Sequence, residues 1–531
     1  MNKTNTHWYE GSVIYQIYPR SFQDSTGDGV GDLRGIISRL DYLADGEGLG
    51  VDAVWLSPFY PSPMADFGYD VSDYCDVDPV FGTLDDFDEL LEAAHSRGIR
   101  MLIDLVPNHT SIEHEWFKES RASRDNPKRD WYIWRDADED GMPPNNWLSV
   151  FGGRAWTWDD ATRQYYLHSF LKEQPDLNWN NPEVREAIAE VMRFWLDRGV
   201  DGFRVDATDH VGKAKGLPDD TLKSSERGYD INDYGSLMHE NSVDAGAYHQ
   251  HMNYIADVLS DYEERIAVFE TWGRNGQSDE ELHRFYDEMK QPNAMPFNFQ
   301  LMDAKWDANK YQWLINQFQS GLKQDHTPVY VLSNHDRPRF PGRIGEEATR
   351  VAAMLELTLP GVALVYYGDE IGMADVKVQP HQVQDPLGES HPDQGRDGAR
   401  SPMQWSQEDN AGFSKGTPWL PVAKDYKEKN VSLQNGDKGS VLELYKSLIS
   451  MRRIQPALKY GGYVEVDSSD ERVLEFERVC DDQRLRIVLN FSGDRIDMPE
   501  LESSRVLLST GNNDSETTPS LGPYTGLILE V

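Results

Sequence analysis

The sequence contains very little cysteine. Among its 531 residues only Cys75 and Cys480 are cysteines, and they lie far apart along the chain. A disulfide framework needs several cysteines, so we predict two free thiols in a reducing compartment.

Long apolar runs are also missing. No stretch approaches the roughly 18 uninterrupted apolar residues of a membrane span. Residues 1–11 hold one lysine and no apolar run, which argues against a secretory signal. We therefore expect a soluble, cytoplasmic protein that has no membrane partner.

Positive charge is in short supply as well. Lys and Arg total 52 against 91 Asp and Glu, which gives a formal net charge of −39. Such an acidic surface repels phosphate backbones, so nucleic acid is excluded as a partner. The chain is too long for one compact core and predicts a large domain with smaller modules. We expect a monomer or a weak homodimer.

Short apolar runs alternate with helical patterns along most of the chain. Segments 36–43, 84–98 and 182–198 have the apolar spacing of helices. The last is bounded by Asn181 as a cap, Pro182 at the first helical position and Gly199 as a stop. Runs with the composition of buried strands occupy 13–18, 51–56, 100–106, 200–206, 265–270, 296–299, 329–332 and 362–367. This alternation indicates a parallel sheet with crossover helices, and eight such units make a (β/α)8 barrel. The predicted fold class is therefore α/β, a TIM barrel.

Two parts of the chain depart from this alternation. One is rich in Trp, Asn, Asp, Gly and Pro with little periodicity, which is typical of a functional insertion. The other has short alternating strands, which predict an antiparallel β-sandwich. We assign the barrel to 1–107 and 180–455, a lid-like subdomain inserted after the third strand to 108–179, and a C-terminal β domain to 456–531.

An acidic loop follows the first predicted strand. Oxygen-bearing side chains stand at relative positions 1, 3, 5 and 9, and a carbonyl is available at position 7; the residues are Asp24, Thr26, Asp28, Asp32 and Val30. This is the ligand spacing of a calcium loop, although position 12 is Gly35 and not the Glu of an EF-hand. A solvated acidic turn is the alternative. We favour one structural divalent cation, Ca²⁺ or Mg²⁺, and no organic cofactor.

Three carboxylates follow predicted strands: Asp206, Glu270 and Asp336. The C-terminal ends of barrel strands form one rim, so these side chains are expected to meet. Arg204 shares a strand face with Asp206, and its guanidinium favours the ionised carboxylate. A buried ion pair without chemistry is the alternative for this pair alone.

Crowded carboxylates are useful in glycoside hydrolysis. Like charges raise one another's pKa, a cost that folding alone does not explain. An ionised carboxylate attacks the anomeric carbon, while a protonated one donates to the leaving oxygen. Asp206 suits the first role and Glu270 the second.

The ordered motifs resemble the α-amylase family of glycoside hydrolases, in particular its α-glucosidase and oligo-1,6-glucosidase branch. They are Asp104-Leu-Val-Pro-Asn-His109, Gly202-Phe-Arg-Val-Asp206, Phe269-Glu270 and Asn334-His-Asp336, with further segments at 68–70, 174–178 and 398–405. The resemblance implies that Asp206 is the nucleophile, Glu270 the acid/base and Asp336 a third carboxylate that grips the sugar. It also implies that the acidic loop binds an ion, although Thr26 stands where relatives often have Asn.

The same resemblance implies a set of substrate-binding side chains. They are Asp66, Tyr69, His109, Arg204, His335 and Arg400, with Phe151 and Phe170 as aromatic walls. For the two phenylalanines, ordinary core packing is the alternative.

The implied activity is that of a retaining α-glucosidase acting on small oligosaccharides or disaccharides. It would release α-glucose from the non-reducing end through a covalent glucosyl-enzyme intermediate. Relatives that favour α-1,6 bonds tend to carry valine after the nucleophile, whereas this chain has Ala207, so we predict a preference for α-1,4 bonds. The alternative is a transglucosylase or a sucrose- or trehalose-converting isomerase, which uses the same carboxylates. A non-catalytic partner of a membrane transporter is disfavoured, because all three carboxylates are present.

Overall fold

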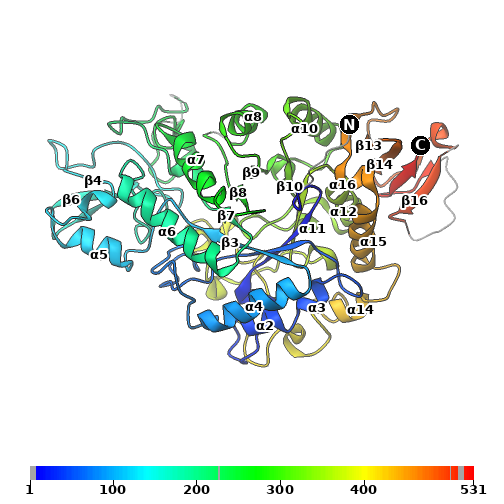
Figure 1. Ribbon diagram of the computed structural model, residues 1–531, viewed down its shortest axis with the longest axis horizontal. Helices are drawn as coiled ribbons and strands as arrows, with labels where there is room; N and C mark the ends of the chain where they lie inside the picture. The colour runs from blue at the N-terminus through cyan, green and yellow to red at the C-terminus, as the bar shows by residue number, and fades with distance from the viewer. Residues whose placement is uncertain (1–6, 225–227, 275, 503, 512–519) are drawn as a thin grey trace.

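Eight parallel strands close into a barrel at the centre of the molecule (Figure 1). The computed structural model describes residues 7–224, 228–274, 276–502, 504–511 and 520–531. Around the barrel the strands follow the order β1 (Val13–Ile17), β2 (Ala53–Leu56), β3 (Arg100–Leu105), β7 (Gly202–Val205), β8 (Ile266–Phe269), β9 (Ala294–Asn298), β10 (Val329–Val331) and β11 (Val362–Tyr366). The predicted (β/α)8 barrel is confirmed.

Side chains along each strand alternate between the barrel interior and the helix layer. On β7, Phe203 and Val205 are buried in the core that faces the helices. Arg204 turns the other way, and its guanidinium lies over the ring of Trp55 on β2 at 5.1 Å. Strands β3 and β7 pair so that Asp104 stands directly beside Arg204. The strand register therefore brings opposite charges together inside the barrel.

Helices cover the outside of the barrel. The longest, α6 (Pro182–Arg198), begins with the Asn181 side chain capping the Glu183 N–H and ends at Gly199, where φ is 110°. These are the start and stop signals that the sequence predicts. The other helices between the first and last barrel strands are α1 (Pro19–Phe22), α2 (Leu33–Ile37), α3 (Leu40–Leu43), α4 (Leu84–Ser96), α5 (Glu115–Ala122), α7 (Tyr248–Leu259), α8 (Asp279–Glu288), α9 (Gln300–Asp303), α10 (Ala308–Gly321), α11 (Phe340–Ile344) and α12 (Thr349–Thr358).

The prediction of a single helix over 36–43 is wrong. The structure has two short helices there, α2 and α3, separated at Ser38 and Arg39. The Ser38 hydroxyl donates to the Gly35 carbonyl at 2.6 Å, and Arg39 leaves helical geometry with φ −112° and ψ 3°. A serine hydroxyl that bonds a carbonyl of the preceding turn competes with continuation of the helix.

The inserted segment between β3 and α6 has a small antiparallel sheet of its own. Its strands run in the order β4 (Trp134–Arg135), β6 (Gln164–Leu167), β5 (Trp156–Asp159). Figure 1 shows this sheet and α5 at one end of the molecule and the C-terminal strands at the other. The predicted boundaries of the insertion fall in the connections, because β3 ends at Leu105 and α6 begins at Pro182.

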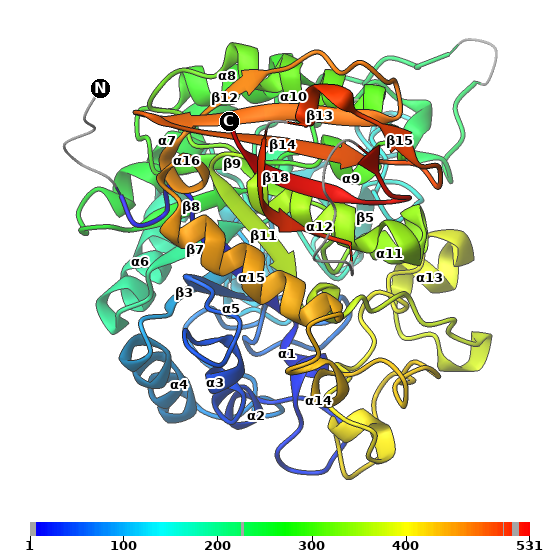
Figure 2. The same ribbon diagram turned by 90° about the vertical axis from the view of Figure 1, so that its right-hand side faces the viewer.

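After β11 the chain forms loops and the short helices α13 (Pro386–Ser390) and α14 (Val431–Gln434), then α15 (Val441–Ile454) and α16 (Pro456–Tyr460). The last part is an antiparallel sheet of five strands, which faces the viewer in Figure 2. Its order is β12 (Gly462–Glu465), β13 (Val473–Cys480), β14 (Gln483–Asn490), β18 (Gly526–Glu530) and β16 (Arg505–Ser509).

Alternation along β13 gives this sheet two buried faces. Leu474 and Phe476 pack in the main core with the barrel helices. Val473 packs on the other face, together with residues of a two-stranded sheet formed by β15 (Ile496–Asp497) and β17 (Ser520–Leu521). The expected sandwich is thus a five-stranded layer with a two-stranded one against it.

Within the described ranges, Cys75 and Cys480 are free thiols, as predicted, and each is partly buried. No helix in that part of the chain combines the length and the apolar character needed to cross a bilayer.

Candidate active site

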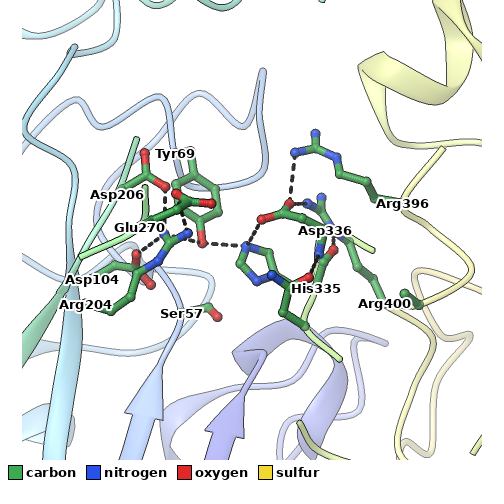
Figure 3. A network of polar contacts seen from close by, with 12 residues as sticks. Ser57, Tyr69, Asp104, Arg204, Asp206, Glu270, His335, Asp336, Arg396 and Arg400 are labelled. Atoms are coloured by element: carbon green, nitrogen blue, oxygen red, sulfur yellow. Dashed lines mark hydrogen bonds and ion pairs between the residues drawn. The ribbon is translucent and has the colours of Figure 1, made fainter. Parts of the chain in front are cut away.

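One guanidinium at the end of β7 holds three carboxylates (Figure 3). Nη1 of Arg204 lies 2.5 Å from Oδ1 of Asp104 and 2.6 Å from Oδ1 of Asp206. Nη2 lies 2.7 Å from Oε2 of Glu270. The Arg204 side chain is only 2% exposed, so water does not compete for these contacts. The carboxyl groups predicted to meet at the ends of β7 and β8 are therefore joined by a shared counter-charge.

The sharing changes the expected protonation. Burial raises the pKa of Asp206 well above its ordinary value, and Arg204 only partly opposes this because Glu270 and Asp104 draw on the same positive charge. Burial likewise raises the pKa of Asp104 to about 6. Arg204 does favour the ionised form of Asp206, as expected, but it is shared with Asp104 and Glu270. Three carboxyls around one guanidinium carry more negative charge than it can balance, which is why the pKa values of Asp206 and Asp104 are raised.

Glu270 receives two further hydrogen bonds. The backbone N–H of Ala207 donates to Oε2 at 2.9 Å, and the indole Nε1 of Trp272 donates to Oε1 at 3.0 Å. Ala207 reaches this position with φ 45° and ψ 38°, in the left-handed region. The residue that follows the candidate nucleophile is thus turned towards the candidate acid/base.

A second charged cluster surrounds Asp336 at the end of the β10 segment. Oδ1 of Asp336 lies 3.0 Å from Nη2 of Arg400 and 3.3 Å from Nη1 of Arg396. Nη2 of Arg396 also contacts Asp66 and Asp385, at 2.7 Å each. Figure 3 shows both arginines approaching Asp336 from the side opposite Arg204.

The charged neighbours keep Asp336 ionised. Burial by itself would raise its pKa, but His335, Arg396 and Arg400 hold that pKa well below the usual range. Burial lowers the pKa of His335 far below 6.5, so the imidazole is neutral. The two guanidiniums therefore supply the lasting stabilisation of the Asp336 charge.

A neutral pair connects the two clusters. The hydroxyl of Tyr69 lies 2.6 Å from Nε2 of His335, and their rings stack at 5.4 Å. Nη1 of Arg204 donates to the same hydroxyl at 3.3 Å. Nδ1 of His335 lies 2.8 Å from Nε2 of Gln16 on β1. Both rings are buried, so they fix the spacing between the clusters.

His109 and Asp66 meet through Gln174. Nε2 of Gln174 lies 3.2 Å from Oδ2 of Asp66 and 3.1 Å from Nε2 of His109. Burial lowers the pKa of His109 to about 4, which leaves it neutral at physiological pH.

The two phenylalanines of the insertion lie over this group. The ring of Phe170 is 5.1 Å from that of His109 and 6.2 Å from that of Phe151. The guanidinium carbon of Arg396 lies 5.3 Å from the Phe151 ring. The structure therefore brings every predicted catalytic and substrate-binding residue into one region.

The acidic loop predicted to bind a cation lies apart from this cluster. The Asp24 carboxylate accepts hydrogen bonds from the N–H groups of Gly27 and Gly29 and from the Ser414 hydroxyl. Although burial opposes it, these bonds lower the pKa of Asp24. The carboxylates, the hydroxyl and the carbonyl are the hard oxygen donors that Ca²⁺ and Mg²⁺ prefer. In the described part of the chain, no three acidic or histidine side chains converge as metal ligands, so the cation stays a prediction.

The sequence did not reveal Arg396 or Trp272 as site residues, nor the contact of the Asp104 carboxylate with Arg204. Asp104 had a visible signal, because it stands in a strand motif that also contains His109. Arg396 lies four residues before Arg400 in a loop without periodicity. Its contacts with Asp66 and Asp336 arise only when distant segments meet.

Comparisons with known proteins place this chain among glycoside hydrolases. The family model described as "Alpha amylase, catalytic domain" matches residues 16–461. An oligo-1,6-glucosidase of Bacillus cereus is 38% identical, with 99% of each chain covered. A probable alpha-glucosidase of Rhizobium meliloti (strain 1021) is 41% identical over 91% of this chain and 89% of the relative.

Solved structures give the same picture. The alpha-glucosyl transfer enzyme XgtA superposes with a TM-score of 0.91 at 38% identity, covering 99% of this chain and 100% of its own. The trehalulose synthase MutB from Pseudomonas mesoacidophila MX-45 gives 0.88 at 33% identity with the same coverage.

Replacing Arg204 tests the shared counter-charge. Arg204→Met leaves the carboxyls of Asp104, Asp206 and Glu270 without their cation, which we expect to cost about 3–5 kcal/mol of stability near pH 8. A carboxyl whose folded-state pKa lies above its unfolded value contributes stability at low pH, and this is lost as pH rises through the folded-state pKa. The deficit relative to wild type should therefore be smaller at pH 5 than at pH 8.

Urea denaturation at several pH values measures this deficit. Arg121→Met is a matched control, because its partner Asp159 keeps hydrogen bonds from Thr162. An Arg204→Met deficit that stays constant between pH 5 and pH 8 would contradict the shared charge.

Proposed function

We propose that this chain, which belongs to the α-amylase family, is a retaining α-glucosidase that removes α-glucose from the non-reducing end of short α-glucosides. The family comprises glycoside hydrolases, and the chain covers its catalytic domain model. The observation that carries the proposal is the pair of Asp206 and Glu270 on the single guanidinium of Arg204. That sharing favours the short carboxyl separation of retaining enzymes, about 5 Å, over the wider gap of inverting ones.

In the proposed mechanism, Asp206 attacks the anomeric carbon while Glu270 gives its proton to the leaving oxygen. A C–O bond to Asp206 forms as the glycosidic C–O bond breaks. Water then loses a proton to Glu270 and adds to the anomeric carbon, which breaks the ester. α-Glucose leaves, and the site returns to one ionised and one protonated carboxyl. The reactive form of the site is the one in which Asp206 is ionised and the proton lies on Glu270.

The second cluster is assigned to the glucose that is released. Asp336, held ionised by Arg396 and Arg400, accepts hydrogen bonds from ring hydroxyls and grips the sugar. Asp66 and His109 bind the far side of the same ring. Phe151 and Phe170, whose rings lie 6.2 Å apart beside His109 and Arg396, are assigned as aromatic walls for this glucose.

The linkage preference is assigned to Ala207. Its left-handed backbone is strained for a β-branched residue, at a cost of order 1–3 kcal/mol. The small methyl leaves space next to the leaving group, between Asp206 and Glu270. We infer a preference for α-1,4 over α-1,6 bonds.

Glucosyl transfer is the second candidate. Two of the solved structures that resemble this chain are named an alpha-glucosyl transfer enzyme and a trehalulose synthase. Transfer needs the same carboxylates and replaces water by a sugar hydroxyl in the second step. The choice depends on whether a sugar or water reaches the glucosyl-enzyme first.

Product analysis tests the function. Purified protein is incubated separately with maltose, isomaltose, trehalose and sucrose, and anomers are followed by NMR over the first minutes. We expect α-glucose as the first product, formed fastest from maltose. New oligosaccharides or an isomerised disaccharide would support transfer. β-Glucose as the first product would contradict the retaining mechanism.

The catalytic assignment is tested by two conservative variants. Asp206→Asn removes the nucleophile and Glu270→Gln the acid/base, and we expect maltose turnover to fall by about 10²–10⁴-fold or more in each. Asp125→Asn, at an exposed site, is the control. Near-wild-type turnover in either catalytic variant, with an unchanged melting temperature, would refute the assignment.

The cation is tested by chelation. If Asp24, Thr26, Asp28, Val30 and Asp32 hold a divalent ion, its binding free energy adds to folding stability. EDTA should then lower the melting temperature, and added Ca²⁺ or Mg²⁺ should restore it. Asp28→Asn should weaken the response to the ion. An unchanged melting temperature in a metal-free preparation would contradict the site.

A further inference from the structure

A buried carboxylate, Asp209, faces the loop that follows the acid/base. It belongs to the short 3-10 helix Thr208–His210, three residues after the candidate nucleophile. Oδ1 accepts a hydrogen bond from the Thr271 hydroxyl at 2.6 Å, and Oδ2 accepts from the N–H groups of Trp272 at 2.5 Å and Gly273 at 3.0 Å. One carboxylate thus fixes three successive residues.

The neighbouring residues extend this contact. The N–H of Ala207 donates to the Glu270 side chain, and the N–H and hydroxyl of Thr208 donate to the Glu270 carbonyl at 3.2 and 2.5 Å. Residues 207–209 therefore bind residues 270–273 at every step. The segment after the nucleophile therefore fixes the position of the segment that carries the acid/base.

These contacts position the indole of Trp272 next to the Glu270 carboxyl. Nε1 donates to Oε1 of Glu270 at 3.0 Å. The ring stacks on Phe299 at 4.1 Å with an interplanar angle of 10°, and the guanidinium of Arg337 lies 4.6 Å from it. Ring packing restricts the indole, while the Asp209 carboxylate restricts its backbone.

An N–H donor at this oxygen matters most during proton transfer. As Glu270 gives its proton to the leaving oxygen, negative charge develops on the carboxyl. A fixed donor gains strength as that charge grows, so it lowers the barrier more than it stabilises the ground state. A donor displaced by a fraction of an ångström loses much of this effect.

We infer that Asp209 is a positioning residue for the acid/base, holding Trp272 so that its indole N–H supports proton donation by Glu270. The inference rests on the proposed role of Glu270. Asp209 does not touch the substrate and acts only through Trp272.

The cost of keeping this carboxylate supports a specific role. Burial raises the pKa of Asp209 to about 7, Asp244 adds to the rise, and hydrogen bonds from Thr271, Trp272 and Gly273 oppose it. The phenol of Tyr248 on α7 also lies close enough to be affected by its charge. A neutral residue at this position would avoid that cost.

The test compares two substrates that differ in their need for an acid. Maltose has a poor leaving group and needs protonation, whereas α-glucosyl fluoride does not. The ratio of kcat/KM for maltose to kcat/KM for the fluoride is independent of the amount of active enzyme. A merely structural role for Asp209 would therefore leave this ratio unchanged.

Asp209→Ala and Trp272→Phe should both lower the ratio. We expect kcat/KM for maltose to fall by about 10-fold or more and that for the fluoride by less than about 3-fold. Trp272→Phe keeps an aromatic ring that can stack on Phe299 and removes the indole N–H.

Asp209→Asn should keep a ratio near wild type. Its amide oxygen can accept from both backbone N–H groups, and its NH2 can donate to the Thr271 hydroxyl. Asp220→Asn is the matched control, because Asp220 is also buried and accepts from a backbone N–H and a hydroxyl, those of Asn241 and Ser242. Its side-chain partners are His239, Asn241 and Ser242 rather than residues of the Glu270 loop, so its ratio should equal that of wild type.

The outcomes separate the inference from its premise. Glu270→Gln should lower the ratio most, and an unchanged ratio in that variant would overturn the role of Glu270 itself. A lowered ratio in Glu270→Gln with unchanged ratios in Asp209→Ala and Trp272→Phe would overturn the positioning role alone. If Asp209→Ala does not fold, Asp209→Ser replaces it, since the serine side chain is too short to reach the N–H groups of both Trp272 and Gly273.

Discussion

A shortage of positive charge at Arg204 governs this active site. Three buried carboxyls share one guanidinium, so the group cannot ionise fully without a large electrostatic cost. The strand register of β3 and β7 creates the shortage by placing Asp104 beside Arg204. A second carboxylate on the neighbouring strand end then competes with Asp206 for the same cation. The arrangement raises the pKa of Asp206 and of Asp104 and so favours a protonated carboxyl in the group, which acid/base chemistry needs.

The balance of charge is less negative around Asp336. There, two guanidiniums, those of Arg396 and Arg400, serve three carboxylates, because Asp66 and Asp385 also contact Arg396. The buried pair of Tyr69 and His335 separates this cluster from the one at Arg204. The site therefore combines two carboxyls whose pKa is raised, those of Asp206 and Asp104, with one whose pKa is held low, that of Asp336.

Several features could be predicted from the sequence because they are encoded locally. Apolar runs of strand length predicted all eight barrel strands, and Asn181, Pro182 and Gly199 predicted both ends of α6. Asp206 and Glu270 were recognisable because each closes a strand, and strand ends of a barrel share one rim. The prediction of one helix over 36–43 failed because the Ser38 hydroxyl donates to the Gly35 carbonyl, a contact that periodicity does not reveal.

The sequence by itself determined the barrel, the order of its strands and the three carboxylates on one rim, since each depends on patterns a few residues long. Only the tertiary structure decided how charge is divided among them. Arg396 reaches Asp66 and Asp336 from a loop far along the chain, and Asp209 reaches Trp272 across two strand ends. Hydrogen bonds and ion pairs depend on distances of a few ångströms between such segments, and those distances exist only in the folded chain.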